Sequence, residues 1–519
     1  MIAEYDKLER QATKLDDEIY DKLKKSILQY AIQGKLVPQE PNDEPASVLL
    51  ERIRAEKKAK LGKKYVDSYI YKGDDNCYYE KVGETVTNIS DEIPFDLPEN
   101  WSWIRLGYII DFSKSDTVIA SQIKPLSWVL DLEDIEKDSG RLLQKKAMGE
   151  TQSKSDKHSF SKGNVLYSKL RPYLNKVIVA DDDGYCTTEI LAFDFGQYIA
   201  AQYAQMYFMS PHFVDYAMDG AYGVKMPRIG SHRGNSALMP LPPYTEQIHL
   251  VNRIDELFEQ IDIIEQNQTD IDTLYDEFRK RTLTLAIQGK LVPQNPNDEP
   301  ANVLLERNRA EKKAKLGKKY VDSYIYKGDD NYYYEHIAGR EQDELVEVPF
   351  DIPDSWAWVR WGNLSFSIQY GYNAPAKESG CIKMVRISDI HNNEVDWEHV
   401  PFCDINETDI KTYLLKENDI LFARTGGTVG KSYLVTCVPE EAIYAGYLIR
   451  TQYSAQLSAQ YLKFFMESSL YWMQLKDGTI ATAQPNCNGQ TLSKMILPLP
   501  PLAEQKRIVA KINEMFAIL

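Results

Sequence analysis

A long internal repeat limits the folds available to this chain more than any other feature of its sequence. Residues 31–76 recur as residues 286–331, an offset of 255, with only three differences over the 46 positions. A second block, residues 241–247, recurs as residues 499–505 at an offset of 258. Solenoid repeats are about 20 to 50 residues long, far shorter than this period. The repeat therefore predicts a duplicated pair of domains.

The segments between the matched blocks, residues 108–235 and 363–492, share almost nothing recognisable. A simple duplication would diverge at a similar rate everywhere, although uneven drift or gene conversion of the framework would also leave this contrast. Near-identity beside near-unrelatedness favours a fixed scaffold that carries two different inserts. Strand-like and short helical runs in both inserts predict a mixed α/β fold for each.

The scaffold carries a helical pattern. Residues 247–287 keep an apolar heptad, which Gln268 interrupts. At 1.5 Å per residue, a helix of this length is roughly 60 Å long, and its apolar stripe needs a partner helix. The apolar positions are Ile254, Ile261, Tyr275, Leu257, Ile264, Ile271 and Phe278.

The two ends of the chain supply the expected partner. Met1 aligns with Glu256 at the first offset and Leu519 aligns with Ile261 at the second, so the chain ends almost where it begins in the repeat. An N-terminal helix and a short C-terminal helix would together rebuild a second rod. The two rods are predicted to pack antiparallel about a pseudo-two-fold axis.

Several classes of protein are disfavoured by the composition. The chain begins with a charged segment and contains no run of about 18 apolar residues, so we expect a cytoplasmic protein without a membrane span. The six cysteines form no C-x-x-C pair, which argues against a zinc site and against a disulfide framework.

Catalytic motifs are also missing. Residues 241–244 resemble the [Asn/Asp/Ser]-Pro-Pro-[Tyr/Phe] loop of amino-methyltransferases, but Leu241 cannot accept the hydrogen bonds of a target amino group. Residues 426–432 resemble a P-loop that is one residue short. No H-E-x-x-H motif or nucleophile elbow occurs, although a scattered carboxylate site stays open. We therefore interpret the Pro-Pro segments as hinges into helices and expect a non-catalytic chain.

The net charge of −16 requires any DNA-binding surface to be local, because affinity for phosphate comes from Lys and Arg. Residues 141–176 carry nine Lys and Arg against two acids, a local charge of +7. A single cation or loop amide is as readily a solvated surface group, but clusters in both inserts favour DNA contact. The candidates in the first insert are Arg141, Lys145, Lys146, Lys169, Arg171, Tyr173, Asn175, Lys176, Lys225, Arg228 and Arg233. Those in the second insert are Tyr370, Tyr372, Asn373, Arg386, Arg424, Thr425, Lys431, Gln484 and Asn486.

Four sets of residues together resemble the specificity subunits of type I restriction-modification enzymes, and the resemblance covers essentially the whole chain. They are residues 31–39 with their copy from 286, the two Pro-Leu-Pro-Pro…Glu-Gln blocks from 240 and 498, residues 165–174, and residues 419–426.

The resemblance implies that each insert is a target recognition domain that reads one half of a bipartite, asymmetric DNA site. It implies that the helical regions dock two modification subunits, which carry S-adenosylmethionine and methylate adenine. Restriction subunits would join for translocation and cleavage driven by ATP and Mg²⁺. On this view the chain itself binds no cofactor or metal.

The predicted fold is thus mixed α/β, with two globular target recognition domains separated by two long antiparallel coiled-coil spacers. The expected regions are an N-terminal helical region (1–91), the first recognition domain (92–243), a central helical spacer (244–346), the second recognition domain (347–500) and a C-terminal helix (501–519).

Two other functions stay open at this point. The chain could be a stand-alone bivalent DNA-binding regulator, which copurification with a methyltransferase would argue against. It could also be a self-contained nuclease or methyltransferase, which activity of the purified chain would establish.

Overall fold

The computed structural model describes residues 18–151, 155–223, 225–391, 393–425, 428–478 and 487–518. The described chain divides into two compact units, one ending at Asn267 and one beginning at Gln268. Each unit holds one copy of the repeat with its insert, and each has its own hydrophobic core. Within the described ranges, no helix is both long and apolar enough to cross a membrane.

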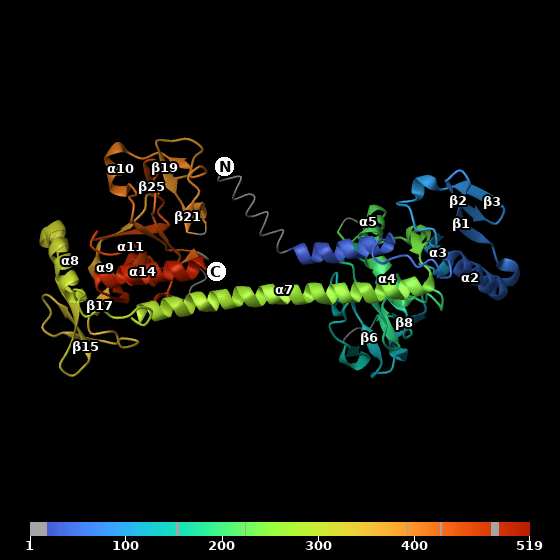
Figure 1. The fold of residues 1–519 in the computed structure, drawn as a ribbon, viewed down its shortest axis with the longest axis horizontal. Helices are drawn as coiled ribbons and strands as arrows, with labels where there is room; N and C mark the ends of the chain where they lie inside the picture. Colours follow the sequence, from blue (N-terminus) through green and yellow to red (C-terminus); the bar gives the residue numbers. More distant parts are fainter. Residues whose placement is uncertain are drawn as a thin grey trace. The chain divides into compact units, whose positions relative to one another are not determined.

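The near-identical scaffold segments fold in the same way in both units (Figure 1). A basic helix, a short 3-10 turn and a three-stranded antiparallel sheet come first, and a two-stranded pair then closes the base of each insert. In the first unit these are α2 (Ala46–Leu61), η1 (Gly62–Lys64), β1 (Ser68–Lys72), β2 (Tyr78–Val82), β3 (Thr85–Asn88), and β4 (Ser102–Arg105) paired with β13 (Leu238–Leu241). A helix over the described residues 18–32 precedes them. In the second they are α8 (Ala301–Leu316), η7 (Gly317–Lys319), β14 (Ser323–Lys327), β15 (Tyr333–Ile337), β16 (Glu344–Val346), and β17 (Ala357–Arg360) paired with β27 (Ile496–Leu499).

Each insert is a mixed α/β domain, as predicted. The first contains α3 (Leu106–Ile109), β5 (Thr117–Val118), β6 (Trp128–Leu130), β7 (Lys146–Ala147), β8 (Lys157–Phe160), β9 (Val165–Ser168), β10 (Val177–Val179), β11 (Gly184–Thr187), β12 (Ile190–Phe193), α4 (Ala201–Met209), α5 (Pro211–Asp219) and α6 (Ser231–Ser236). The second contains α9 (Trp361–Leu364), β18 (Ser365–Tyr370), β19 (Ile382–Val385), β20 (Ile390–His391), β21 (Glu394–Val395), β22 (Phe402–Cys403), α10 (Glu407–Tyr413), β23 (Ile420–Ala423), β24 (Ser432–Leu434), β25 (Ala442–Tyr444), β26 (Leu448–Tyr453), α11 (Ala459–Phe465), α12 (Ser469–Gly478) and α13 (Gly489–Lys494).

The two inserts share a topology that their sequences conceal. In the first, β9 lies between β10 and β12, and in the second, β23 lies between β24 and β26, with all four pairings antiparallel. A parallel pair accompanies each of these sheets, β6 with β11 and β19 with β25. Strand-to-strand register therefore makes individual positions of the two inserts equivalent, although their side chains differ.

The predicted long helix is α7 (Tyr244–Ile287), which has 44 residues and is compatible with a spacer. Within the first unit, its first turns lie antiparallel to the helix over residues 18–32 (Figure 1), and Lys24 Nζ lies 2.5 Å from Asp262 Oδ1. Within the second unit, the C-terminal helix α14 (Leu502–Ala517) lies beside its last turns, where the Arg279 guanidinium lies 4.6 Å from the centre of the Phe516 ring.

Only some of the predicted heptad positions of α7 are buried. Ile254 and Ile261 are buried, whereas Ile264 and Ile271 are 56% and 58% exposed. Residues 1–17, on which part of the predicted second rod falls, lie outside the described residues. The antiparallel pairing of two complete rods about a pseudo-two-fold axis, and the five-region division of the chain, stay predictions.

A buried carboxylate at the start of a helix joins the repeated segments in each unit. Glu246, in the first turn of α7, accepts hydrogen bonds from Trp101 Nε1 at 2.8 Å and from Gln39 Nε2 at 2.5 Å. Glu504, in the first turn of α14, accepts the corresponding bonds from Trp356 Nε1 and Gln294 Nε2. Burial raises the pKa of both carboxyl groups above the usual range for glutamate.

The neighbouring glutamine completes this junction. Gln247 Oε1 accepts a hydrogen bond from the Ala200 amide at 2.8 Å, and Gln247 Nε2 donates to Pro242 O at 3.1 Å. Gln505 makes the equivalent bonds in the second unit. Because each Pro-Pro segment lies between a strand of the closing pair and a helix, the prediction that these segments are hinges into helices is confirmed.

We predict that Glu246→Ala lowers the free energy of unfolding of the first unit by about 1–3 kcal/mol, because it leaves the buried Trp101 indole N–H without an acceptor. Urea unfolding of the full-length chain, followed by far-UV circular dichroism, measures this. Glu259→Ala, an exposed position on the same helix, is the matched control and should stay within about 0.5 kcal/mol. Glu246→Ala combined with Trp101→Phe should cost less than the sum of the single changes. Additive costs would contradict the proposed pairing.

Candidate nucleic-acid interface

In the first insert, the end of β9 brings cations from two loops together. The Lys169 amide donates to Glu189 O at 3.0 Å, and the Arg171 amide donates to Pro227 O at 2.7 Å. Leu170 forms an isolated bridge with Arg228. The main chain thus joins the predicted groups around Lys169 and Arg228, which lie far apart in the sequence.

A tight turn follows β9 and presents Tyr173. Arg171 and Asn175 have φ angles of 52° and 51°, a region that non-glycine residues rarely occupy, and they flank η6 (Pro172–Leu174). Tyr173 is 44% exposed. Asn175, by contrast, is buried and its Nδ2 donates to Met209 O at 3.0 Å. Tyr173 is therefore on the surface, while Asn175 fastens the turn to the domain.

Many of the predicted cations in this insert are already paired with carboxylates. Arg141 lies 3.0 Å from Glu136, Lys145 lies 2.6 Å from Asp181, and Lys146 lies 2.7 Å from both Glu133 and Asp134. All four of these acids come from outside residues 141–176. The local charge of +7 counted along the sequence is therefore largely neutralised in space.

The remaining candidates of the first insert are partly paired within the domain and partly without an ion-pair partner. Arg228 pairs with Glu189 at 2.9 Å, and Arg233 pairs with Asp219 at 3.2 Å while its guanidinium stacks on Tyr216. Lys176 Nζ donates to Leu132 O at 2.6 Å. Lys225 is exposed, and neither Lys225 nor Arg171 has an ion-pair partner among the described residues. The structure thus leaves Lys169, Arg171, Tyr173 and Lys225 as the part of this cluster without an ion pair among the described residues, although Lys169 acts electrostatically on the Glu189 carboxylate.

In the second insert, the end of β23 forms the equivalent site. The Arg424 amide donates to Tyr447 O at 3.2 Å, as the Lys169 amide donates to Glu189 O. The Arg424 guanidinium lies 4.8 Å from the centre of the Tyr370 ring. Tyr370 OH accepts a hydrogen bond from the Gly489 amide at 3.0 Å. The structure therefore brings together Tyr370 and Arg424, which the sequence places in separate motifs.

Tyr447 is a member of this cluster that sequence reasoning missed. Its side chain is 63% exposed, and its carbonyl holds the Arg424 amide. Nothing in the surrounding sequence distinguishes it from other tyrosines of the chain. Its place becomes visible only from the register of β23 with β26.

The segment that resembles a P-loop forms part of the connection between β23 and β24. The Lys431 amide donates to Thr428 O at 3.0 Å, and Ala423 donates its amide to Lys431 O at 2.9 Å. Lys431 is exposed and has no side-chain partner among the described residues, whereas Thr425 is partly buried. This connection joins antiparallel strands rather than leading from a strand into a helix, so it differs from a nucleotide-binding P-loop.

Most of the other predicted residues of the second insert are less accessible for contact with DNA. Tyr372 donates its amide to Tyr444 O at 2.8 Å and packs its ring on Tyr413. Arg386 pairs with Asp389 at 2.7 Å, while Asn373 is exposed. Gln484 and Asn486 lie outside the described residues.

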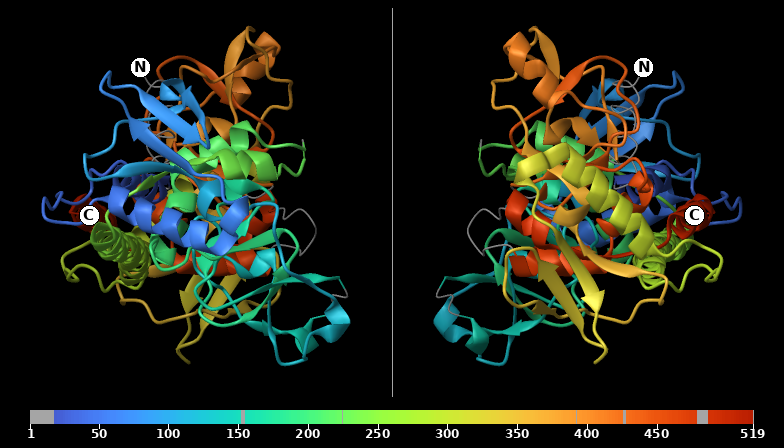
Figure 2. Two further views of the ribbon diagram at one scale, coloured as in Figure 1. Left: turned by 90° about the vertical axis from the view of Figure 1, so that its right-hand side faces the viewer. Right: turned by 90° about the vertical axis from the view of Figure 1, so that its left-hand side faces the viewer.

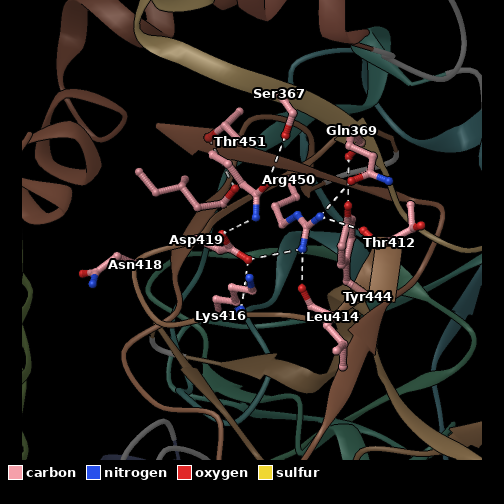
Figure 3. Close-up of polar contacts among 12 residues, drawn as sticks. Ser367, Gln369, Thr412, Leu414, Lys416, Asn418, Asp419, Tyr444, Arg450 and Thr451 are labelled. Carbon is pink, nitrogen blue, oxygen red and sulfur yellow. Dashed lines mark hydrogen bonds and ion pairs between the residues drawn. The ribbon is translucent and has the colours of Figure 1, made fainter. Parts of the chain in front are cut away.

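A buried arginine supports the sheet behind this cluster (Figure 3). Arg450 is 3% exposed and Asp419 is 5% exposed, with Arg450 Nη1 3.4 Å from Asp419 Oδ2. Arg450 Nη2 donates to Gln369 Oε1 at 2.7 Å and to Thr412 O at 2.9 Å. Gln369 precedes Tyr370 on β18, so this network fixes the strand that presents the tyrosine.

The Arg450 network belongs to the second insert alone. Strand register aligns Arg450 with Ala192 and Asp419 with Asn164 of the first insert. Burial raises the pKa of Asp419 above its usual value even though Arg450 opposes the shift. The same sheet is therefore built around an ion pair in one insert and around neutral residues in the other.

The sequence of this chain is similar to those of type I restriction enzyme specificity subunits, and its fold is similar to that of a solved chain. Residues 372–518 match the family model of the type I restriction modification DNA specificity domain. The EcoAI type I restriction enzyme specificity subunit of Escherichia coli is 28% identical, with 95% of this chain and 88% of that protein covered. The EcoEI type I restriction enzyme specificity subunit of Escherichia coli is 27% identical, with 96% and 89% covered.

A solved chain from a study of complex assembly in the type I restriction-modification system has a similar fold. The TM-score is 0.51 at 16% sequence identity, with 82% of this chain and 92% of that chain covered. At this identity the similarity concerns the fold alone. The sequence matches confirm the resemblance on which the sequence-based prediction rested.

We predict that Arg450→Met lowers the free energy of unfolding of the second unit by about 3–5 kcal/mol, because Asp419 would stay buried without its counter-ion. Adding Asp419→Asn should restore part of the loss, since the first insert has Asn164 at the equivalent position. Urea unfolding of the full-length chain compares the two variants. Equal losses would show that the charge of Asp419 does not need Arg450.

Proposed function

We propose that this chain, which belongs to the type I restriction-modification specificity family, reads a bipartite, asymmetric DNA target with one insert on each half. The observation that carries the proposal is the pair of equivalent strand ends. Lys169 with Glu189 in one insert corresponds to Arg424 with Tyr447 in the other, through the same backbone hydrogen bond. One fold that presents different side chains at one position suits two readers of different base sequences.

The chemistry of these side chains supports base recognition. Arginine forms bidentate hydrogen bonds with guanine in the major groove, and lysine contacts the same acceptors. The Nε atoms of Arg171 and Arg424 are buried and have no hydrogen-bond partner in the described structure, so only the terminal nitrogens of each guanidinium could serve a ligand. Because Tyr370 lies against the Arg424 guanidinium, less side-chain freedom is lost when Arg424 binds.

Two inserts also give the selectivity that a restriction system needs. Reading ~3 to 4 base pairs with one insert selects about one site in 64 to 256, and two inserts multiply this to roughly one in 16,000. Each base pair contributes ~1 to 3 kcal/mol of discrimination. A bipartite target follows from placing one reader in each copy of the repeat.

In this proposal the chain is a non-catalytic subunit that works in the cytoplasm. Two modification subunits dock on its helical regions and methylate adenine with S-adenosylmethionine. Restriction subunits, with ATP and Mg²⁺, join them for cleavage. The lack of a polar residue before Pro242-Pro243 and the hairpin connection around Lys431 support the assignment of the chemistry to partner subunits.

We predict that Arg424→Ala relaxes recognition of one half-site and Lys169→Ala relaxes recognition of the other, each by about 1–3 kcal/mol if the side chain contacts a base. Sequencing of methylated adenines in host DNA, with the variant chain and its modification subunits expressed together, measures this.

Matched controls lie at the opposite ends of the same strands. Lys162 precedes β9 and Lys416 precedes β23, and both are exposed, so Lys162→Ala and Lys416→Ala should leave the methylation motif unchanged. If Arg424→Ala and Lys169→Ala relaxed the same half-site, the two inserts would not be separate readers. Adenine methylation by the purified chain alone would refute the non-catalytic assignment.

A further inference from the structure

The most basic exposed surface of the scaffold occurs twice. Residues 52–64 contain seven Lys and Arg and one Glu, a net charge of +6 in a chain of net charge −16. Residues 307–319 repeat this segment with a single difference, Asn308 in place of Ile53. Both of these side chains are buried, so the exposed charges of the two copies are identical.

The arginines of this segment have partners within their own unit. Arg52 lies 2.7 Å from Glu44, and Arg54 forms an ion pair with Asp67. In the other copy, Arg307 lies 2.6 Å from Glu299. These side chains therefore have a structural role in the scaffold.

The lysines beyond them are mostly free. Lys57 and Lys312 donate to main-chain carbonyls of their own units, but the four lysines that follow Lys57 in α2 and η1 are exposed and have no side-chain partner among the described residues. In the second copy, three of the four are in the same state, and Lys315 pairs with Glu311 at 3.0 Å. The two sets, which we name the lysine surfaces, are Lys58, Lys60, Lys63 and Lys64, and Lys313, Lys315, Lys318 and Lys319.

The backbone gathers each set at one end of its helix. Gly62 and Gly317 end α2 and α8 with φ angles of 55° and 54°, and the 3-10 turn that follows places two more lysines beside the last helical turn. In the end-on views of Figure 2, α2 faces the viewer on the left and α8 faces the viewer on the right. Neither helix is covered on that side by another element of its own unit.

Stabilisation of the helix explains only part of this arrangement. Lysines in the last turn of a helix interact favourably with its dipole, by about 0.3–1 kcal/mol each, which accounts for Lys58 and Lys60. Lys63 and Lys64 lie beyond the end of the helix, where this effect has faded. Their exposed side chains contribute no packing, so a ligand is the better explanation for them.

We propose that the two lysine surfaces bind the phosphate backbone of duplex DNA without regard to sequence, one beside each half-site. The proposal rests on the proposed function, because it takes DNA as the ligand of the chain. Two identical surfaces beside two different inserts require a ligand that is the same at both half-sites, and both the phosphate backbone and a pair of identical modification subunits meet this condition. A protein partner fits less well, because lysine is depleted and arginine enriched at protein interfaces.

The position of α8 in its unit is consistent with this assignment. Lys315 Nζ lies 3.7 Å from the centre of the Phe366 ring, near the start of β18, and Tyr370 ends the same strand. Four residues of strand span ~13 Å. The major groove of DNA is ~12 Å wide, so a duplex read by Tyr370 and Arg424 has phosphates within reach of the lysine surface.

The test removes four lysines without disturbing the fold. The variant Lys58→Gln, Lys63→Gln, Lys313→Gln and Lys318→Gln acts at two equivalent positions of each lysine surface. The control is Lys35→Gln, Lys72→Gln, Lys290→Gln and Lys327→Gln, which removes the same charge from exposed positions of both copies. A thermal midpoint equal to that of the parental chain, measured for each variant, establishes that neither is misfolded.

The measurement is the affinity of the full-length chain, in complex with its modification subunits, for a random-sequence duplex between about 50 and 200 mM salt. We expect the slope of log K against log[salt] to fall by about 0.9 for each phosphate that the variant no longer neutralises, and the control to keep the parental slope. The half-site preference of the variant should stay unchanged, because interactions with phosphate carry no sequence information.

Each other outcome has a definite meaning. A slope equal to that of the control would overturn the proposal. So would loss of modification subunits with an unchanged slope for the complexes that remain, because the lysine surfaces would then bind protein. A lower slope in a complex without any half-site preference would support the lysine surfaces and refute the proposed function.

Discussion

The arrangement of each unit depends on a buried glutamate at the start of a helix. Glu246 and Glu504 are almost inaccessible to solvent, and a buried carboxylate is costly unless donors surround it. The donors come from the loop after the first helix and from the tryptophan before the closing strand, so three distant segments meet at one group. Because the strand pair beside this junction closes the insert, everything between its two strands can change without altering the scaffold.

The inserts show how far that freedom extends. Both keep a central strand between two antiparallel neighbours and a parallel pair beside it. The interior still differs, since the second insert buries Arg450 with Asp419 where the first has Ala192 and Asn164. A buried ion pair adds little net stability, because desolvation offsets the attraction, but it fixes geometry. In the second insert it fixes Gln369, and thereby the strand that carries Tyr370, whose ring lies beside Arg424.

The sequence was sufficient for features that repeat or are periodic, and insufficient for those that depend on tertiary contacts. The duplication, the mixed α/β class, α7 and the Pro-Pro hinges all follow from local pattern. The neutralisation of Lys145 by Asp181 does not, because the two residues meet only in space. The burial of Asn175 could not be predicted from the sequence either, because an asparagine in the left-handed conformation of a turn can serve structure or recognition equally well. Tyr447 became visible only through strand register.

The overall acidity of the chain is compatible with local basic surfaces because electrostatic interactions are short-ranged in salt. The Debye length is ~8 Å at physiological ionic strength, so a duplex seated on Lys169 or Arg424 is governed by the charges nearest to it. The net charge of −16 disfavours approach of DNA to the rest of the surface. Non-specific binding depends on the number of phosphates that cations neutralise, so an acidic chain keeps it weak. Base contacts then supply a larger share of the binding free energy, which raises the ratio of specific to non-specific affinity that determines selectivity in a genome.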